Sequence, residues 1–315
     1  MDRTRTRFSD LAWAVLTFTV LVVLGGAIVR ATGSGDGCGE SWPVCADRIF
    51  PANPGIETVI EYGHRLMSAA AIAGIVVLFL WARRLYGRGD RVRRAASAAA
   101  LLIVVESLIG ASLVLFGWVG DDASIGRMLV VPLHLINTMF LLAALTFTAW
   151  WATGYPQPPR EAVRSPRGKR LALGAGALVL VATAGALNAL ADTLYPSDDF
   201  VSGVRDELAG GAPFLVQARV LHPVLAILIG LAVAALVVNI GAGSSDRTRL
   251  LGRAVVGLVI AQFALGVINV LLATPLETQV FHLAMANGIW IGYLLFSASL
   301  LGEPARSPTP ISAQS

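Results

Sequence analysis

The chain has few charged residues, and this scarcity excludes an ordinary soluble domain. Only 14% of its 315 residues are charged and 56% are hydrophobic, whereas a soluble domain carries about a quarter charged residues. No basic stretch is interleaved with aromatic residues, so a pI near 9.5 does not indicate nucleic-acid binding. We therefore expect a membrane protein with no nucleic-acid partner.

The chain contains long apolar segments that carry almost no charged residues. A transmembrane helix needs about 20 predominantly apolar residues. Eight segments qualify, and because they lack the apolar–polar alternation of strands, helices are favoured over a β-barrel. The predicted fold is an all-α integral membrane protein of eight transmembrane helices. The segments are residues 11–30, 63–82, 95–118, 129–152, 171–190, 214–240, 250–272 and 278–301.

Lysine and arginine are concentrated in alternate loops. The two termini and the loops 83–94, 153–170 and 241–253 hold 18 of the 24 basic residues. Most acidic residues lie in the intervening loops. The positive-inside rule then predicts a membrane protein with both termini in the cytoplasm and its acidic loops outside.

Histidine is also rare, and its four occurrences are equivalent in this topology. One histidine lies near the start of each of the second, fourth, sixth and eighth apolar segments: His64, His134, His222 and His282. The predicted topology places all four in one layer towards the outer face. Histidine is costly where it faces lipid and is a standard axial ligand of haem iron. One such histidine could be merely interfacial or hydrogen-bonded, but four in equivalent places predict two ligand pairs. Zinc or copper would recruit further carboxylate or thiolate ligands, and only Glu61 is close in sequence.

The two halves of the chain repeat one another. The stretch around Glu106 and Gly110 aligns with that around Gln262 and Gly266. We expect two tandem four-helix bundles related by a pseudo-twofold axis along the membrane normal, each able to hold a haem between facing helices. His64 would pair with His134, and His222 with His282. The predicted parts are a cytoplasmic N-terminus (1–10), an N-terminal bundle (11–152), a linker (153–170), a C-terminal bundle (171–301) and a disordered tail (302–315).

The halves differ beside their first histidines. Glu61 precedes His64 by three residues and shares its helix face, whereas Arg219 occupies the equivalent place before His222. A carboxylate beside a porphyrin can act as a base or stabilise positive charge. Arg219 could instead pair with a haem propionate. Arg65 could do the same or serve as an interfacial anchor. We predict a reactive first half and an electron-transfer or structural second half, although Glu61 could also cap its helix.

Three further polar residues have two interpretations each. Glu106 lies near the middle of an apolar segment, where a carboxylate is expensive; it is either a structural hydrogen-bonding group or a proton relay. Cys38 and Cys45, the only cysteines, lie in the first outer loop, where oxidising conditions favour a disulfide. That disulfide is either a structural staple or a redox group.

Several of these motifs resemble one known family. Leu24–Gly35, followed by Cys38–Cys45, resembles the first-helix and first-loop signature of haem A synthase, and Ile60–Arg65 resembles its second motif. The resemblance covers the whole chain. It implies an oxidoreductase acting on CH or CH2 groups, which oxidises a porphyrin methyl of haem O to a formyl group by successive hydroxylations with oxygen from water. The product, haem A, serves cytochrome oxidase.

The resemblance also implies residue roles. His64 and His134 would flank the substrate haem O, and His222 and His282 would ligate a haem b. Glu61 matches the essential glutamate of the family.

The cysteines Cys38 and Cys45 match the first-loop pair of the family. The chain departs from the pattern in two places. Residues 191–213 lack the second cysteine pair of some members, and Glu106 stands where members often have glutamine.

The resemblance suggests haem O synthase and cytochrome oxidase assembly factors as candidate partners, alongside membrane lipid and a second copy of the chain. Two other functions also fit four histidines. A di-haem cytochrome b-type electron carrier would need neither Glu61 nor the cysteines, and a haem transporter or chaperone would tolerate loss of Glu61.

Overall fold

The protein is built from long α-helices, as its apolar segments predict. The computed structural model describes residues 3–209 and 211–304, without the side chains of Phe200 and Leu208. This part of the chain contains no β-strand and has eight spans long and apolar enough to cross a membrane, so the protein is a multi-pass, all-α membrane protein. The spans are α1 (Arg3–Ala31), α2 (Ile56–Leu85), α3 (Arg91–Leu115), α4 (Ile125–Ala152), α6 (Pro166–Leu194), α8 (Phe214–Ala218) with α9 (Leu221–Gly241), α10 (Asp246–Leu271) and α11 (Leu276–Gly302).

Most helices run beyond their apolar segments, because polar residues continue and cap them. At the start of α3 the Asp90 side chain accepts a hydrogen bond from the Val92 N–H, at 2.7 Å. Serine side chains cap α4, α6 and α10 in the same way. Of the tail expected to be disordered, Gly302 still belongs to α11, and residues 305–315 lie outside the described residues.

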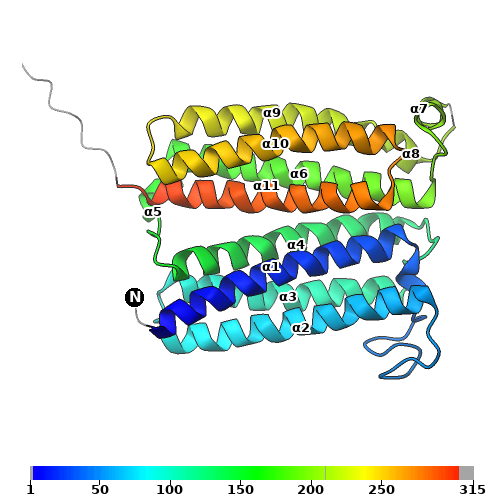
Figure 1. Ribbon diagram of the computed structural model, residues 1–315, viewed down its shortest axis with the longest axis horizontal. Coiled ribbons are helices and arrows are strands. Elements are labelled where there is room, and N and C mark those ends of the chain that lie inside the picture. Colours follow the sequence, from blue (N-terminus) through cyan, green and yellow to red (C-terminus); the bar gives the residue numbers. More distant parts are fainter. Residues whose placement is uncertain (1–2, 210, 305–315) are drawn as a thin grey trace, which may run out of the picture.

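Figure 1 shows the long helices in two groups, α1–α4 in one and α6 with α9–α11 in the other. Helices α4 and α1 of the first group pack against α6 and α11 of the second. Trp290 on α11 donates its indole N–H to the Met139 carbonyl on α4, at 2.8 Å. Arg30, near the end of α1, donates to Thr193 on α6 and to Gln279 on α11. The groups therefore share both apolar and polar contacts, and the pseudo-twofold relation between them stays a prediction.

Three short helices lie in the loops: η1 (Ser34–Asp36), α5 (Arg160–Arg164) and α7 (Phe200–Leu208). The loop after α1 and helix α7 lie at one end of the molecule, on the right in Figure 1, and α5 lies at the other. Helices α2, α4, α9 and α11, which carry the histidines, all begin at the end with α7, here called the histidine end.

One span is broken beside its histidine. Helix α8 ends at Ala218 and α9 begins at Leu221, so Arg219 lies in the break. Pro223 explains the interruption, because proline lacks an N–H and its ring clashes with the carbonyl four residues earlier, but it is tolerated in the first turn of a new helix. At this break the Arg219 side chain contacts α6, where it pairs with Asp192 and donates to the Ala191 carbonyl.

Candidate functional site

The four histidines lie at one end of the molecule, on α2, α4, α9 and α11. Each side chain is half-buried. In all four the Nδ1 atom is buried; those of His64, His222 and His282 make no hydrogen bond, whereas that of His134 lies beside a Glu106 carboxylate oxygen. An unpaired buried polar atom is costly, and three such atoms in equivalent places indicate side chains arranged for something other than stability.

A glycine of a neighbouring helix faces each imidazole in the first half. A Cβ atom on Gly26 of α1 would lie 3.1 Å from His64 Cε1, and one on Gly25 would lie 3.4 Å from its Nδ1. A Cβ atom on Gly110 of α3 would lie 3.7 Å from His134 Cε1. The adjoining helices thus approach these rings with backbone alone.

The second half repeats the arrangement more tightly. A Cβ atom on Gly185 of α6 would lie 2.9 Å from His222 Cε1, and one on Gly266 of α10 would lie 3.5 Å from His282 Cε1. Aligning the two halves of the sequence pairs Gly110 with Gly266, but only the structure places each glycine against a histidine.

The rings of His222 and His282 have the spacing of two ligands on one metal. Their centroids lie 6.3 Å apart, with 74° between the ring planes. A bond of about 2 Å from metal to nitrogen, plus roughly 1 Å from nitrogen to ring centre, gives about 6 Å for two imidazoles on opposite sides of an ion. Within the described residues no three histidine, cysteine, aspartate or glutamate side chains gather as ligands of a metal ion. Two imidazoles at this spacing, each beside a glycine, fit a haem.

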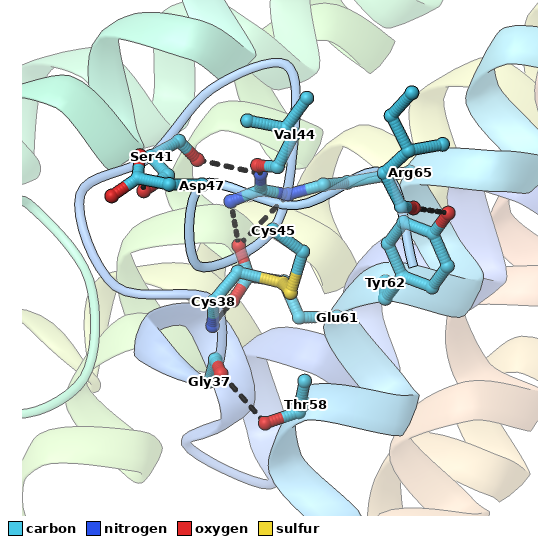
Figure 2. Close-up of a disulfide and its surroundings, with 11 residues drawn as sticks. Gly37, Cys38, Ser41, Val44, Cys45, Asp47, Thr58, Glu61, Tyr62 and Arg65 are labelled. Carbon is cyan, nitrogen blue, oxygen red and sulfur yellow. Dashed lines mark hydrogen bonds and ion pairs between the residues drawn. A yellow bond between two sulfur atoms is a disulfide. The ribbon is translucent and has the colours of Figure 1, made fainter. Parts of the chain in front are cut away.

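The first loop is fastened to Glu61 (Figure 2). Cys38 and Cys45 form the predicted disulfide. The Cys38 N–H donates to Glu61 Oε2 at 2.7 Å, and the Glu61 side chain is only 3% exposed. Helix α2 begins at Ile56 with Gly55 as its N-cap, so Glu61 lies in the second turn and does not cap the helix.

Arg65 makes the other hydrogen bonds that hold this loop, and together with Glu61 it is here called the clamp. It pairs with Glu61, one turn earlier on α2, and donates to the carbonyls of Ser41 and Val44 between the two cysteines. The loop thus receives hydrogen bonds from Arg65 and donates one to Glu61. The two side chains predicted from sequence therefore hold the disulfide loop against the start of α2.

Arg219 makes a matching network in the second half. Its Nε lies 3.1 Å from Asp192 Oδ1, and it donates to the carbonyls of Ala191 and Tyr195 on α6 and beyond it. Asn188 also donates to Asp192, at 3.0 Å. Sequence reasoning missed Asp192, although an acid near the end of an apolar segment is the kind of signal that marks a buried partner.

Glu106 belongs to the site of His134. Its Oε1 lies 3.2 Å from His134 Nδ1. Asn137 and Thr138, both on α4, donate to the same carboxylate. The repeat partner, Gln262, instead donates to the main-chain carbonyl of His282 at 3.2 Å. A carboxylate therefore faces the imidazole only in the first half.

Comparisons with known proteins agree with the geometry. The family model described as cytochrome oxidase assembly protein, COX15-CtaA, matches residues 9–294. The chain is 31% identical to heme A synthase of Halalkalibacterium halodurans over 267 residues, which are 84% of this chain and 87% of that protein. It is 43% identical over 304 residues to a protein of Thermus thermophilus named protoheme IX farnesyltransferase. That match covers 96% of this chain but 50% of the relative, so the chain spans about half the length of this relative.

Proposed function

Because the chain belongs to the COX15-CtaA family of cytochrome oxidase assembly proteins, we propose that it works as haem A synthase. In this reaction a porphyrin methyl group of haem O becomes a formyl group by successive hydroxylations with oxygen from water. The observation that carries the proposal is the fourfold pairing of a histidine with a glycine on a neighbouring helix. That arrangement suits two flat ligands better than one compact ion.

We propose that the second half binds a haem b, which His222 and His282 would hold. The 6.3 Å between their ring centroids supports this assignment. A haem with two histidine ligands supplies one-electron transfer when it is bound. Gly185 and Gly266 keep side chains away from the imidazoles.

We assign the substrate haem O to the first half, between His64 and His134. Glu61 lies one turn before His64, and the Cys38 N–H and Arg65 hold its carboxylate as a hydrogen-bond acceptor. Such a carboxylate can take up a proton while the ring methyl is oxidised and favour attack by water. The clamp on the first loop would fix its position during these steps.

Glu106 would act on His134. A carboxylate that accepts the Nδ1–H of a metal-bound histidine fixes the tautomer and ring orientation and makes the other nitrogen a stronger ligand. The 3.2 Å contact supports this role. Donors from Asn137 and Thr138 keep the carboxylate in place. We therefore prefer this positioning role to a proton relay.

Arg65 and Arg219 stay proposed partners of haem propionates. Each already has intramolecular acceptors, so each would exchange a carbonyl or carboxylate for the propionate. Arginine is well suited to such an exchange, because its planar group presents several donors at once.

The name of the Thermus relatives favours a second activity, transfer of a farnesyl group to protohaem. Each of these matches covers only 50% of the relative, whereas the match to heme A synthase of Halalkalibacterium halodurans covers 87% of that protein. The fuller match supports oxidation of haem over farnesyl transfer. We therefore propose that this chain oxidises a farnesylated haem and receives it from a farnesyltransferase partner, haem O synthase.

We further propose that the histidine end faces the outside of a bacterial cell membrane and that both termini face the cytoplasm. The basic loops at the opposite end support this orientation. Cytochrome oxidase assembly factors, and a second copy of the chain, stay candidate partners.

The test is to co-express the full chain with haem O synthase and to identify the extracted haems by mass. Haem A or the hydroxylated intermediate supports the proposal. Bound haem b together with unchanged haem O would instead support an electron carrier. New haem O in cells that lack haem O synthase would support farnesyl transfer.

A further inference from the structure

A groove lies between α3 and α4, towards the end opposite the histidines. It has a volume of about 520 Å³. Ala95 and Ala98 on α3 line one side, and Phe140, Ala144 and Phe147 on α4 line the other. Residues three or four apart share one helix face, so small side chains on both helices leave a trough with aromatic rings beside it. Neither haem site includes these residues.

Four arginines line a second hollow, which shares two of them with this groove. Arg91 and Arg94 come from α3, and Arg160 and Arg164 come from α5; the second hollow has a volume of about 280 Å³. Across residues 3–209 and 211–304, no carboxylate forms an ion pair with any of them. Arg91 instead lies over the Trp151 ring, 5.9 Å from its centroid. This hollow thus concentrates positive charge that no ion pair offsets within the described part of the chain.

The two hollows together have the shape and charge of a site for an amphipathic anion. We propose that they bind an anionic phospholipid. Its phosphate would lie among the arginines of α3 and α5, and one acyl chain would lie in the groove between α3 and α4. Arginine binds phosphate through several donors, and basic pockets between transmembrane helices on the cytoplasmic side favour anionic headgroups.

Charge selects this occupant over the farnesyl tail of a haem. A farnesyl tail would fill the apolar trough, but its far end carries no anion and would leave the four arginines unpaired. A zwitterionic lipid offers a phosphate whose charge its own headgroup offsets. An anionic lipid satisfies the trough and the arginines together.

The site also joins parts of the chain that are distant in sequence. Helix α5 belongs to the connection between α4 and α6, and it contacts α6 and α11 of the second group. A lipid held by Arg91 and Arg160 would therefore tie that connection to α3 of the first group. We expect it to stabilise the packing of the two groups.

The test measures lipid retention by the full chain, and it needs no haem. Native mass spectrometry would compare phosphatidylglycerol with phosphatidylcholine of the same acyl chains. Replacing all four arginines by glutamine (R91Q, R94Q, R160Q, R164Q) should reduce phosphatidylglycerol retention by about tenfold or more, because each basic residue near the headgroups contributes to binding. Phosphatidylcholine retention should change little.

A matched control removes the same charge elsewhere at this end. Arg83, Arg84, Arg88 and Arg253 are exposed and lie outside both hollows. Their replacement by glutamine should leave phosphatidylglycerol retention unchanged. Equal loss in the two quadruple variants would overturn the proposal, because it would show only a general attraction to a basic surface.

A second variant tests the apolar part without changing charge. Ala98 is exposed in the groove, so Ala98→Leu should fill the trough and lower phosphatidylglycerol retention several-fold while the arginines stay in place. Unchanged retention in this variant would overturn the placing of the acyl chain. Because haem content is measured separately, failure here would leave the proposed oxidation untouched.

Discussion

The residue three positions before the first histidine differs in charge between the halves but has the same kind of surroundings. Glu61 pairs with Arg65 and accepts a hydrogen bond from the Cys38 N–H. Arg219 pairs with Asp192 and donates to the Ala191 carbonyl. Each side chain fastens a neighbouring segment to the start of the histidine-bearing helix. The roles are reversed: Glu61 pairs with a cation and accepts from a main-chain N–H, whereas Arg219 pairs with an anion and donates to a main-chain carbonyl. Both halves therefore use the residue at this position to hold a neighbouring segment in place. Only in the first half is that residue a carboxylate, Glu61.

A second difference lies behind the other histidine of each pair. Glu106 faces the imidazole of His134, whereas Gln262 reaches only the main chain of His282. Both carboxylates thus belong to the half proposed to hold haem O. Under the proposed function, these two side chains would distinguish the half that oxidises haem O from the half that transfers electrons.

The largest expected effect is that of Glu61→Gln. Loss of general-base and electrostatic help should lower haem A formation by about 100-fold or more, while haem b stays bound to the second half. Mass analysis of the extracted haems measures haem A formation, and absorbance measures the bound haem b. Glu57→Gln is the matched control, because Glu57 is exposed one turn earlier on α2. Normal haem A production by Glu61→Gln would remove this residue from the reaction.

Replacing a second-half ligand should separate the two sites. If His222 holds a haem b as proposed, His222→Ala should abolish tight binding of haem b while haem O still enters the first half. His64→Ala should do the reverse. Haem content per protein, determined by haem type, measures both. Equal loss of both haems in each variant would contradict two separable sites.

Glu106→Gln makes the first half resemble the second. Removing a carboxylate that supports a metal-bound histidine costs about 10- to 100-fold in affinity or activity, and we expect haem A formation to fall within that range. A weaker His134 ligand should also raise the midpoint potential of the first-half haem, which spectroelectrochemistry measures. The mirror variant Gln262→Glu should lower the potential of the second-half haem. Unchanged potentials in both variants would leave Glu106 with a purely structural role.

Much of this comparison could be predicted from sequence, because it depends on patterns within the chain. The eight apolar segments and the disulfide of Cys38 with Cys45 are confirmed. The contrasts of Glu61 with Arg219, and of Glu106 with Gln262, also follow from aligning the halves. Such an alignment shows which residues correspond, and the structure adds the partner that each one meets.

Contacts between distant segments could not be predicted in this way. Asp192 meets Arg219, and Arg30 of the first group meets Gln279 of the second, only because separate helices pack together. Neither pair has a fixed spacing in the sequence. The groove of α3 and α4 likewise depends on which faces of two helices meet.

The smallest effect should come from the glycines, and here the halves differ in degree. A Cβ atom on Gly185 would lie 2.9 Å from His222 Cε1, closer than ordinary contact, whereas one on Gly266 would lie 3.5 Å from His282. Gly185→Ala should therefore displace its imidazole and lower haem b occupancy several-fold, and Gly266→Ala should have little effect. Gly176→Ala is the control on the same helix as Gly185, because nothing lies within 4 Å of its added Cβ. Equal binding of haem b by Gly185→Ala and Gly176→Ala would show that the close approach of α6 does not set the position of His222. The tighter packing of the second half would then not be what holds this imidazole in place.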